Sequence, residues 1–284
     1  MINSICICGA GTMGTGIGQL AASAGISTTL YEVNRDVLKT AQKTIDSNLQ
    51  LLVEKNKIIP EEKEKIFQRI QFTDDVNKCV ADVIIEAVVE NLEAKIHLFG
   101  QLAAINDEKA ILATNTSSLS VTSIASKISQ PGRFLGMHFF NPAPIMKLVE
   151  VINSNYTSKQ TTQIIIDLAR RMGKVPVVCK DSPGFIVNRI ARPYYIESLR
   201  LVEEGQVSFE TMDTLLEASG FKLGPFKLMD LIGNDINYSV SCTVYEQLNK
   251  PKRLMPSAIQ REKVEKGELG KKTGKGYYKY INNN

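Results

Sequence analysis

A glycine-rich turn between an apolar run and an alanine-rich stretch constrains the fold of this chain more than any other feature. Residues 4–32 read SICICGAGTMGTGIGQLAASAGISTTLYE, which has the order strand, turn, helix and second strand. Gly9, Gly11 and Gly14 form GxGxxG: the first allows the tight turn, the second lets a diphosphate approach the backbone, and the third lets the helix pack on the strand. The sequence therefore predicts a β-α-β unit that holds a dinucleotide at its helix N-terminus.

An acidic residue at the end of the second strand indicates which dinucleotide this is. Glu32 lies near the offset of roughly 20 residues at which a carboxylate binds the ribose in such units. A carboxylate accepts hydrogen bonds from the ribose 2′-hydroxyl and repels a 2′-phosphate, which favours NAD over NADP. Arg35 weakens this prediction, because an arginine just after that acid can reach the 2′-phosphate of NADP. The alternative is a glycine turn that binds nothing.

Apolar strand candidates alternate with helical patterns in the first two thirds of the chain. They are 83–87, 111–114, 134–138, 148–152 and 175–179, with a long charged helical stretch at 37–69. This alternation predicts a doubly wound, mostly parallel sheet with helices on both faces. A Ser-Pro-Gly turn follows the last strand candidate. We therefore expect an α/β Rossmann-type, NAD-binding domain over 1–183.

The remaining part, 184–284, has a different pattern. Segments 189–205, 210–220 and 235–248 carry apolar residues three and four apart, and the first two end at Gly205 and Gly220. The sequence predicts an all-helical domain for this part of the chain. The tail at 270–280, GKKTGKGYYKY, is expected to be a turn with solvated basic residues.

Composition excludes several other classes. The net charge is only +4, from 34 basic and 30 acidic residues, too small and dispersed for a nucleic-acid-binding protein. No apolar stretch approaches the roughly 20 residues that span a bilayer, and no signal-peptide pattern is present. The five scattered cysteines include no CxxC pair. We interpret them as reduced thiols of a cytoplasmic protein without a metal site; Cys6 and Cys8 point to one side of a strand and pack in the core.

A histidine and a glutamate stand out in apolar surroundings. His138 ends the strand candidate FLGMH, where parallel sheets present ligand-binding edges, and imidazole accepts protons near neutral pH. Glu150 lies inside KLVEVI, where an ionised carboxylate needs a partner. His138 is the partner that makes chemical sense; a core histidine and an ion pair of Glu150 with Lys147 are the alternatives. Ser117, in TNTSSL after a strand, is a candidate substrate contact, with helix capping by Ser117 or Ser118 as the alternative.

Several segments together resemble one protein family. They are GAGTMGTGI, EAVVEN, TNTSSL, MHFFNPAPIMKLVEV and DSPGFIVNRI, in this order and spacing. The chain is similar over nearly its whole length to the L-3-hydroxyacyl-CoA dehydrogenase family. The resemblance implies that His138 is a general base and Glu150 its orienting acid. It also implies that Ser117 and Asn188 bind the substrate oxygens.

The resemblance extends to cofactor, coenzyme and partner. It implies that Glu90, Lys95 and Asn141 lie along the nicotinamide end of NAD. It also implies that the helical part, 184–284, contributes to substrate binding and forms a homodimer. Lys55, with Lys57 as a weaker candidate, is expected to meet the phosphates of coenzyme A. The alternative is a solvated helix face, which explains Lys55 equally well and Lys57 better. This chain departs from the family pattern at the ribose position, where it has Glu32 and relatives often have aspartate. The full set of expected cofactor-binding residues is Gly9, Gly11, Thr12, Met13, Gly14, Glu32, Glu90, Lys95, Asn115, Ser117 and Asn141.

The implied reaction converts (3S)-3-hydroxyacyl-CoA and NAD to 3-oxoacyl-CoA and NADH, with 3-hydroxybutyryl-CoA as the expected substrate. Segments around 189–205 and 228–245 are also similar to the branch that acts on 3-hydroxyadipyl-CoA. Arg192 or Lys222 is a candidate to meet the extra carboxylate, with a surface position as the alternative. Two other readings are a non-catalytic NAD-binding homologue and a 3-hydroxyacid dehydrogenase. The latter needs a lysine where this chain has Asn188 and Arg189.

Overall fold

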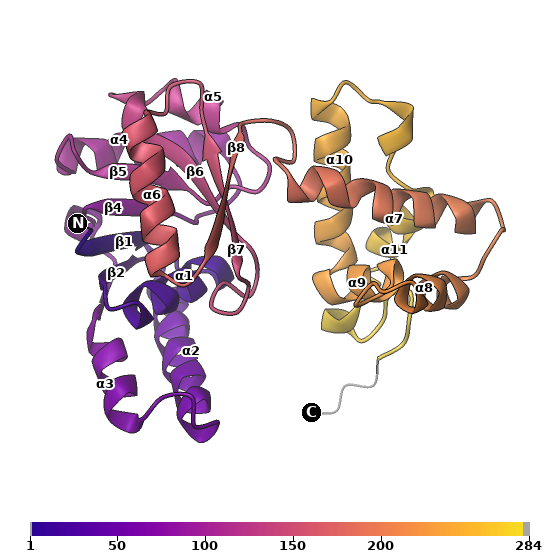
Figure 1. Ribbon diagram of the computed structural model, residues 1–284, viewed down its shortest axis with the longest axis horizontal. Helices are drawn as coiled ribbons and strands as arrows, with labels where there is room; N and C mark the ends of the chain where they lie inside the picture. The colour runs from indigo at the N-terminus through magenta and orange to yellow at the C-terminus, as the bar shows by residue number, and fades with distance from the viewer. Residues whose placement is uncertain (1, 281–284) are drawn as a thin grey trace. The chain divides into compact units, whose positions relative to one another are not determined.

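The computed structural model describes residues 2–280 of the chain. The chain divides into two compact units, Met1–Asp181 and Ser182–Asn284, here called unit 1 and unit 2. Unit 1 combines helices with a sheet, whereas the regular elements described in unit 2 are helical (Figure 1). The division lies close to the predicted boundary after residue 183. The predicted fold class, an α/β sheet domain followed by a helical domain, is confirmed.

A mixed, mostly parallel sheet forms the centre of unit 1. Its strand order is β3-β2-β1-β4-β5-β6-β7-β8. All neighbouring strands run parallel except β6 and β7, which are antiparallel, so the last two strands reverse the direction of the rest. The bounds are β1 Ser4–Cys8, β2 Ser27–Tyr31, β3 Ile70–Thr73, β4 Val83–Glu86, β5 Ile111–Thr114, β6 Phe134–Phe139, β7 Leu148–Asn153 and β8 Val175–Lys180.

Helices cover both faces of this sheet. Apolar side chains of α1 and α6, such as Ile17 and Ile165, pack in one core with Ile5 and Ile7 of β1. The other face is covered by α4, whose Phe99 packs edge-on against Phe134 with ring centroids 4.9 Å apart. Figure 1 shows α6 lying across the sheet. The helices of unit 1 are α1 Thr12–Ser23, α2 Arg35–Glu54, α3 Pro60–Gln68, α4 Leu92–Ile105, α5 Val121–Ala125 and α6 Lys159–Arg171, with 3₁₀ turns η1 Val76–Lys78 and η2 Pro131–Arg133.

The stretch at 37–69, predicted as one helical region, is two helices and is corrected here. The chain turns after α2 at Asn56, whose φ is +53°, and α3 starts at Pro60, which suits the first turn of a helix. The strand β3 that follows was not predicted. It is a four-residue edge strand with only its first and last residues buried, too short for a clear alternation.

The thiols of β1 pack inside unit 1, as predicted. Cys6 and Cys8 are fully buried on one side of the strand, with their sulfurs 3.9 Å apart. The sequence did not predict that Cys79, just after η1, adds a third buried thiol, with all three sulfurs within 4.8 Å of one another. All five cysteines are free. Among the described helices, none is both long enough and apolar enough to cross a membrane.

Unit 2 is a helical bundle with its own apolar core. The core residues include Leu199, Met212 and Phe226. Gly205 and Gly220, with φ of +69° and +104°, follow the ends of α7 and α8, as expected of residues that terminate helices. Its elements are α7 Val187–Glu203, α8 Phe209–Ala218, α9 Pro225–Ile232, α10 Asn234–Gln247, α11 Ala258–Glu265, and 3₁₀ turns η3 Lys252–Leu254 and η4 Lys271–Thr273.

The C-terminal tail contributes more to unit 2 than the sequence predicted. Its lysines are exposed, as expected, but Tyr277 is buried and its ring packs against Phe226 at a centroid distance of 4.9 Å. The backbone N–H groups of Tyr277 and Tyr278 donate to the buried carboxylate of Asp230, each at 3.0 Å. The tail is therefore part of the core and of its hydrogen-bonding network.

Candidate active site

The glycine turn of unit 1 has the backbone geometry that a diphosphate requires. Gly9 has a φ of +105°, and a Cβ on Gly14 would stand 1.8 Å from the carbonyl oxygen of Gly9. The position of a Cβ on Gly11 is open, so a ligand can approach the backbone there. Helix α1 begins at Thr12 without a side-chain cap. Its first N–H groups and its positive dipole end therefore suit an anion, and the turn fits a dinucleotide.

Glu32 is held beside this turn by backbone donors. Its two carboxylate oxygens accept hydrogen bonds from the N–H groups of Ala10 and Asn34, each at 3.1 Å. Arg35 forms an ion pair with Asp74, and the hydrogen bond from Arg35 lowers the pKa of the Asp74 carboxyl. The arginine that weakened the preference for NAD is thus engaged with an acid, and the NAD preference inferred from Glu32 stands.

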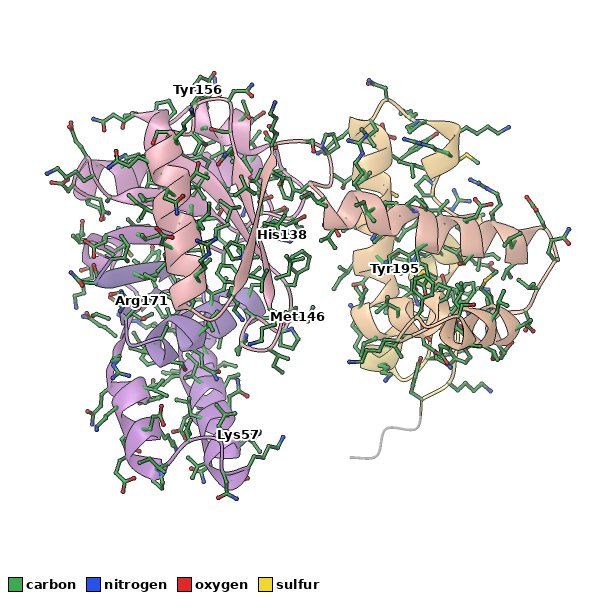
Figure 2. All side chains as sticks on the ribbon, viewed as in Figure 1. Lys57, His138, Met146, Tyr156, Arg171 and Tyr195 are labelled. Carbon is green, nitrogen blue, oxygen red and sulfur yellow. The ribbon has the colours of Figure 1, made fainter. Side chains whose placement is uncertain are left out.

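A cavity of about 980 Å³ opens from the glycine turn within unit 1. It runs between α1, α2 and the loop that follows β6, and Gly11 and Asn141 line it. Lys55 lines its other end, whereas Lys57 does not. Both lysines are exposed, and Figure 2 shows Lys57 at the turn between α2 and α3. Of the two predicted phosphate contacts, only Lys55 therefore borders this cavity.

The histidine and glutamate singled out in the sequence form a buried pair in unit 1. They are directly opposite each other in the antiparallel pairing of β6 and β7. The Nδ1 atom of His138 lies 2.7 Å from Oε2 of Glu150, and the two side chains are 7% and 1% exposed. Figure 2 shows His138 on the part of the sheet that carries these strands. Lys147, the alternative partner of Glu150, is exposed on the preceding loop.

This geometry determines what the imidazole can do chemically. An ionised carboxylate only accepts hydrogen bonds, so a neutral imidazole paired with ionised Glu150 must carry its hydrogen on Nδ1 and its lone pair on Nε2. A proton taken up by Nε2 produces an imidazolium that the carboxylate of Glu150 stabilises. The pair can therefore work as a general base with a fixed tautomer and a fixed ring orientation.

The loop after β5 holds the predicted substrate contact Ser117. Oε1 of Glu90 accepts hydrogen bonds from the hydroxyl of Thr116 at 2.5 Å and from the N–H of Ser117 at 3.1 Å. The side chain that caps α5 is Ser120, so the alternative in which Ser117 or Ser118 caps that helix is wrong. Glu90 thus fixes the backbone of the loop that presents Ser117.

The same loop is tied to the strand of the histidine. Oδ1 of Asn115 accepts a hydrogen bond from the N–H of Phe139 at 2.9 Å, and Phe139 directly follows His138. The ring of Phe140 lies 4.6 Å from the imidazole, measured between centroids. The predicted residues Asn115, Ser117, His138 and Glu150 consequently belong to one connected part of unit 1.

A second buried ion pair was missed by the sequence reasoning. Nζ of Lys95 lies 2.5 Å from Oε1 of Glu86 and 3.2 Å from Oε2 of Glu90, and the side chains of Glu86 and Lys95 are 0% and 1% exposed. Burial raises the pKa of Glu86 despite the nearby charge of Lys95. A signal for Glu86 was present, because it ends the apolar run VIIE just as Glu150 interrupts KLVEVI.

The pKa of Glu90 is shifted in the opposite direction to that of Glu86. Its burial alone would raise its pKa, but the charge of Lys95 and the hydroxyls of Thr116 and Ser118 outweigh that effect and hold the pKa below its ordinary value. Glu90 is therefore an ionised acceptor that organises the loop. Asn188, the remaining predicted substrate contact, lies in the first turn of α7 in unit 2 and is partly buried.

The glycine turn, the acid at the ribose position and the buried histidine–glutamate pair define an NAD-dependent oxidoreductase. Two family models match the chain. Residues 4–182 match the NAD-binding domain of 3-hydroxyacyl-CoA dehydrogenase, and residues 184–280 match the C-terminal domain of the same family. The chain belongs to the 3-hydroxyacyl-CoA dehydrogenase family.

Individual relatives place the chain within this family. It is 42% identical over 279 residues to a 3-hydroxyadipyl-CoA dehydrogenase of Escherichia coli. The aligned region covers 98% of this chain and 59% of that protein. It is 39% identical over 288 residues to the mitochondrial hydroxyacyl-coenzyme A dehydrogenase of Sus scrofa, covering 99% and 92% of the two chains. The crystal structure of (S)-3-hydroxybutyryl-CoA dehydrogenase from Ralstonia eutropha superposes with a TM-score of 0.95 at 36% identity, covering 99% and 100%.

Proposed function

We propose that this chain oxidises (3S)-3-hydroxyacyl-CoA to 3-oxoacyl-CoA reversibly, with His138 as the general base. The observation that carries this proposal is the buried pair of His138 and Glu150, with 2.7 Å between Nδ1 and Oε2, in a unit that also has a dinucleotide-binding turn. Bound NAD supplies the acceptor for the hydride that leaves C3 of the substrate. The protein supplies the acceptor for the proton of the C3 hydroxyl.

The roles of the side chains follow from their chemistry. Nε2 of His138 takes the hydroxyl proton, and Glu150 stabilises the resulting imidazolium. Ser117 and Asn188 donate hydrogen bonds to the substrate oxygens. Lys55, at the end of the cavity beside α2, meets the phosphates of coenzyme A. A larger group borders the NAD: Gly9, Gly11, Thr12, Met13, Gly14, Glu32, Glu90, Lys95, Asn115 and Asn141.

The proposed substrates have a short acyl group. 3-Hydroxybutyryl-CoA is one, in line with the name of the Ralstonia eutropha structure. 3-Hydroxyadipyl-CoA is the second candidate, and two observations support it. The Escherichia coli relative is named for that substrate, and Arg192, expected at the surface or at a substrate carboxylate, is 3% exposed rather than at the surface. Lys222, the other candidate for the carboxylate, is exposed.

We also propose that unit 2 mediates a homodimer. Several large apolar side chains of this unit are at least half exposed, including Phe221, Leu231 and Ile236 at 50%, 52% and 51%. Exposed apolar side chains favour contact with another protein surface when they form a continuous patch. A second copy of the chain is the partner we assign to them.

Replacing the histidine tests the proposed reaction. In His138→Ala the substrate hydroxyl loses its proton acceptor, so kcat should fall at least about 100-fold. The assay follows NADH absorbance with acetoacetyl-CoA and with 3-hydroxybutyryl-CoA. The matched control is His97→Ala, because His97 is exposed on α4 and should leave kcat unchanged. A folded His138→Ala variant that keeps more than about a tenth of wild-type turnover would show that His138 is not the base.

A further inference from the structure

Three buried thiols gather in unit 1, and the proposed reaction uses none of them. Cys6 and Cys8 lie on the same side of β1, and Cys79 directly follows η1. All three residues are 0% exposed. The sulfurs of Cys6 and Cys8 are 3.9 Å apart, and the three sulfurs lie within 4.8 Å of one another. These residues, here called the thiol cluster, place three soft ligand atoms at one point of the core.

The spacing of the sulfurs matches the size of a metal ion. In an equilateral triangle with sides of 3.9 Å, the centre lies about 2.3 Å from each corner, which is the length of a metal–thiolate bond. With sides of 4.8 Å, the upper limit here, the distance is about 2.8 Å, so bond formation needs a closure of about 0.5 Å. Small rotations of the side chains provide this closure. One cation can therefore reach all three sulfurs without a rearrangement of β1.

The charge of the thiol cluster also favours a cation. Hydrogen bonds from the thiols of Cys6 and Cys8 lower the pKa of Cys79, and the hydrogen bonds within the cluster together with burial raise the pKa of Cys6 and of Cys8. One thiolate flanked by two thiols follows from these directions. The carboxylate of Asp75 opposes the shift of Cys79, so a second negative charge acts on the same sulfur. A buried negative charge is costly without a counter-charge, and a single positive charge would neutralise the thiolate.

The number and the softness of the ligands distinguish between metals. The cluster offers three sulfurs among the residues that the structure describes, whereas a structural zinc ion almost always takes four ligands in a tetrahedron. Hard cations such as magnesium and calcium take oxygen ligands. Copper(I) is soft, prefers sulfur, and carries the single positive charge that the thiolate requires. Copper(I) is therefore the cation that fits both the ligands and the charge.

The segment that carries Cys79 gives such an ion a way in. Cys79 lies between two exposed residues, Lys78 and Val80, outside any helix or strand. Its carbonyl oxygen is held by the amide of Asn106 at 2.8 Å, so the short segment is ordered although it lies at the surface. The expectation of cysteines without a metal site considered only neighbours in the sequence, where no CxxC pair occurs. Cys79 joins the cluster from a distant segment.

We propose that Cys6, Cys8 and Cys79 bind one copper(I) ion through their three sulfurs. The first bond forms to the thiolate of Cys79. A thiol proton that is displaced when Cys6 or Cys8 binds the metal leaves to the solvent, and no electron is transferred. The other two cysteines, Cys179 on β8 and Cys242 on α10, are part-exposed and provide controls.

The experiment measures copper(I) binding directly. Copper(I) is supplied as its acetonitrile complex without oxygen, in competition with bicinchoninate, whose copper complex is coloured. The protein carries Cys179→Ser and Cys242→Ser, so that only the thiol cluster remains. It should bind one equivalent, and X-ray absorption at the copper edge should show three sulfurs at roughly 2.3 Å. Adding Cys79→Ser should lower the affinity at least about 100-fold, because even groups behind the ligands contribute about 10- to 100-fold.

Other outcomes overturn the proposal. If a protein without the three cluster thiols competes for copper(I) equally well, the cluster only packs the core and any binding is adventitious. Two sulfurs in the absorption spectrum would mean a pair of cysteines instead of the cluster. Displacement of copper(I) by an equal concentration of zinc would show that the site is built for a divalent ion. If circular dichroism shows that Cys79→Ser does not fold, Cys79→Ala, which keeps the position apolar, replaces it, and the absorption spectrum needs no change in the cluster.

Discussion

Buried carboxylates in unit 1 face cations, whereas those in unit 2 face neutral donors. In unit 1, Glu86 pairs with Lys95, and Glu150 pairs with His138. In unit 2, Asp230 is 1% exposed, and its oxygens accept from the amide of Asn234, the hydroxyl of Tyr280 and two backbone N–H groups. Both arrangements satisfy a buried charge, but only the first places a group that can carry a positive charge beside it.

Asp213 of unit 2 shows what the second arrangement achieves. It lies in α8, is 0% exposed, and accepts from the N–H groups of Phe226 and Lys227 at 2.9 and 3.0 Å. These are N–H groups of the first turn of α9, which has no side-chain cap of its own. A carboxylate is favoured at that end of a helix, so Asp213 fixes α9 against α8. Neutral donors thus determine shape, whereas an imidazole or an ammonium can also exchange a proton.

The largest effect should come from breaking the pair that exchanges a proton. Glu150→Gln replaces a carboxylate that fixes the Nδ1–H tautomer by an amide that can also donate to Nδ1. Both the tautomer and the stabilisation of the imidazolium are weakened, so kcat should fall by roughly 1,000- to 10,000-fold. The measurement is single-turnover NADH formation together with thermal unfolding. Glu64→Gln, an exposed acid on α3, serves as the control. Retention of near-wild-type kcat would mean that Glu150 only balances charge, as the acids of unit 2 do.

Removing the other cation of unit 1 should mainly affect stability. Lys95→Met leaves Glu86 buried without its ion-pair partner, which should lower the free energy of unfolding by about 3 kcal/mol near neutral pH. The control is Lys109→Met, because Lys109 is exposed in the same unit. Chemical denaturation provides the measurement. A loss below about 1 kcal/mol would show that the ammonium is as dispensable as a surface charge.

The pH dependence of this variant gives a sharper test. Burial raises the pKa of Glu86 above the ordinary value of a glutamate, so the folded protein binds more protons than the unfolded chain just above that ordinary pKa. Its contribution to stability therefore falls as the pH rises through that window. Without Lys95 the pKa should be higher still, and the window should extend upward. Lys95→Met should thus lose more stability at pH 8 than at pH 5, and an equal loss at both values would contradict this explanation.

The two units also differ in how well their sequences predicted them. His138 and Glu150 each interrupt an apolar run, and they lie on adjacent strands, so a short separation brings them together. Glu86 gave the same signal but its partner Lys95 lies on a helix, where a lysine is ordinarily exposed. Asp230 meets tail residues 47 to 50 positions away through backbone N–H groups as well as side chains. Backbone donors leave no trace in a sequence pattern.

The strands of the sheet show the same limit of prediction from sequence. Buried runs such as β5 were predicted with their bounds, whereas the short edge strand β3 was not. The direction of a strand is also not encoded in its apolar pattern, and the pairing of His138 with Glu150 depends on the antiparallel direction of β6 and β7. A functional residue was therefore predictable where it interrupts an apolar run. Contacts between segments that are far apart in the sequence were not predictable.

The smallest of the three effects should come from unit 2, in Asp230→Asn. One acceptor oxygen becomes a donor amide that faces N–H or O–H donors, so at least one of them loses its partner. The free energy of unfolding should fall by about 2 kcal/mol. Asp235→Asn is the control, because Asp235 forms a part-exposed ion pair with Lys272, and such pairs contribute about 0 to 1 kcal/mol.

The measurement is urea denaturation followed by circular dichroism at several pH values, with turnover of 3-hydroxybutyryl-CoA recorded below the transition. Because the site proposed for proton transfer is in unit 1, the folded variant should keep kcat within about twofold, in contrast to Glu150→Gln. A large loss of kcat in a stably folded Asp230→Asn protein would mean that the acids of unit 2 act beyond determining shape.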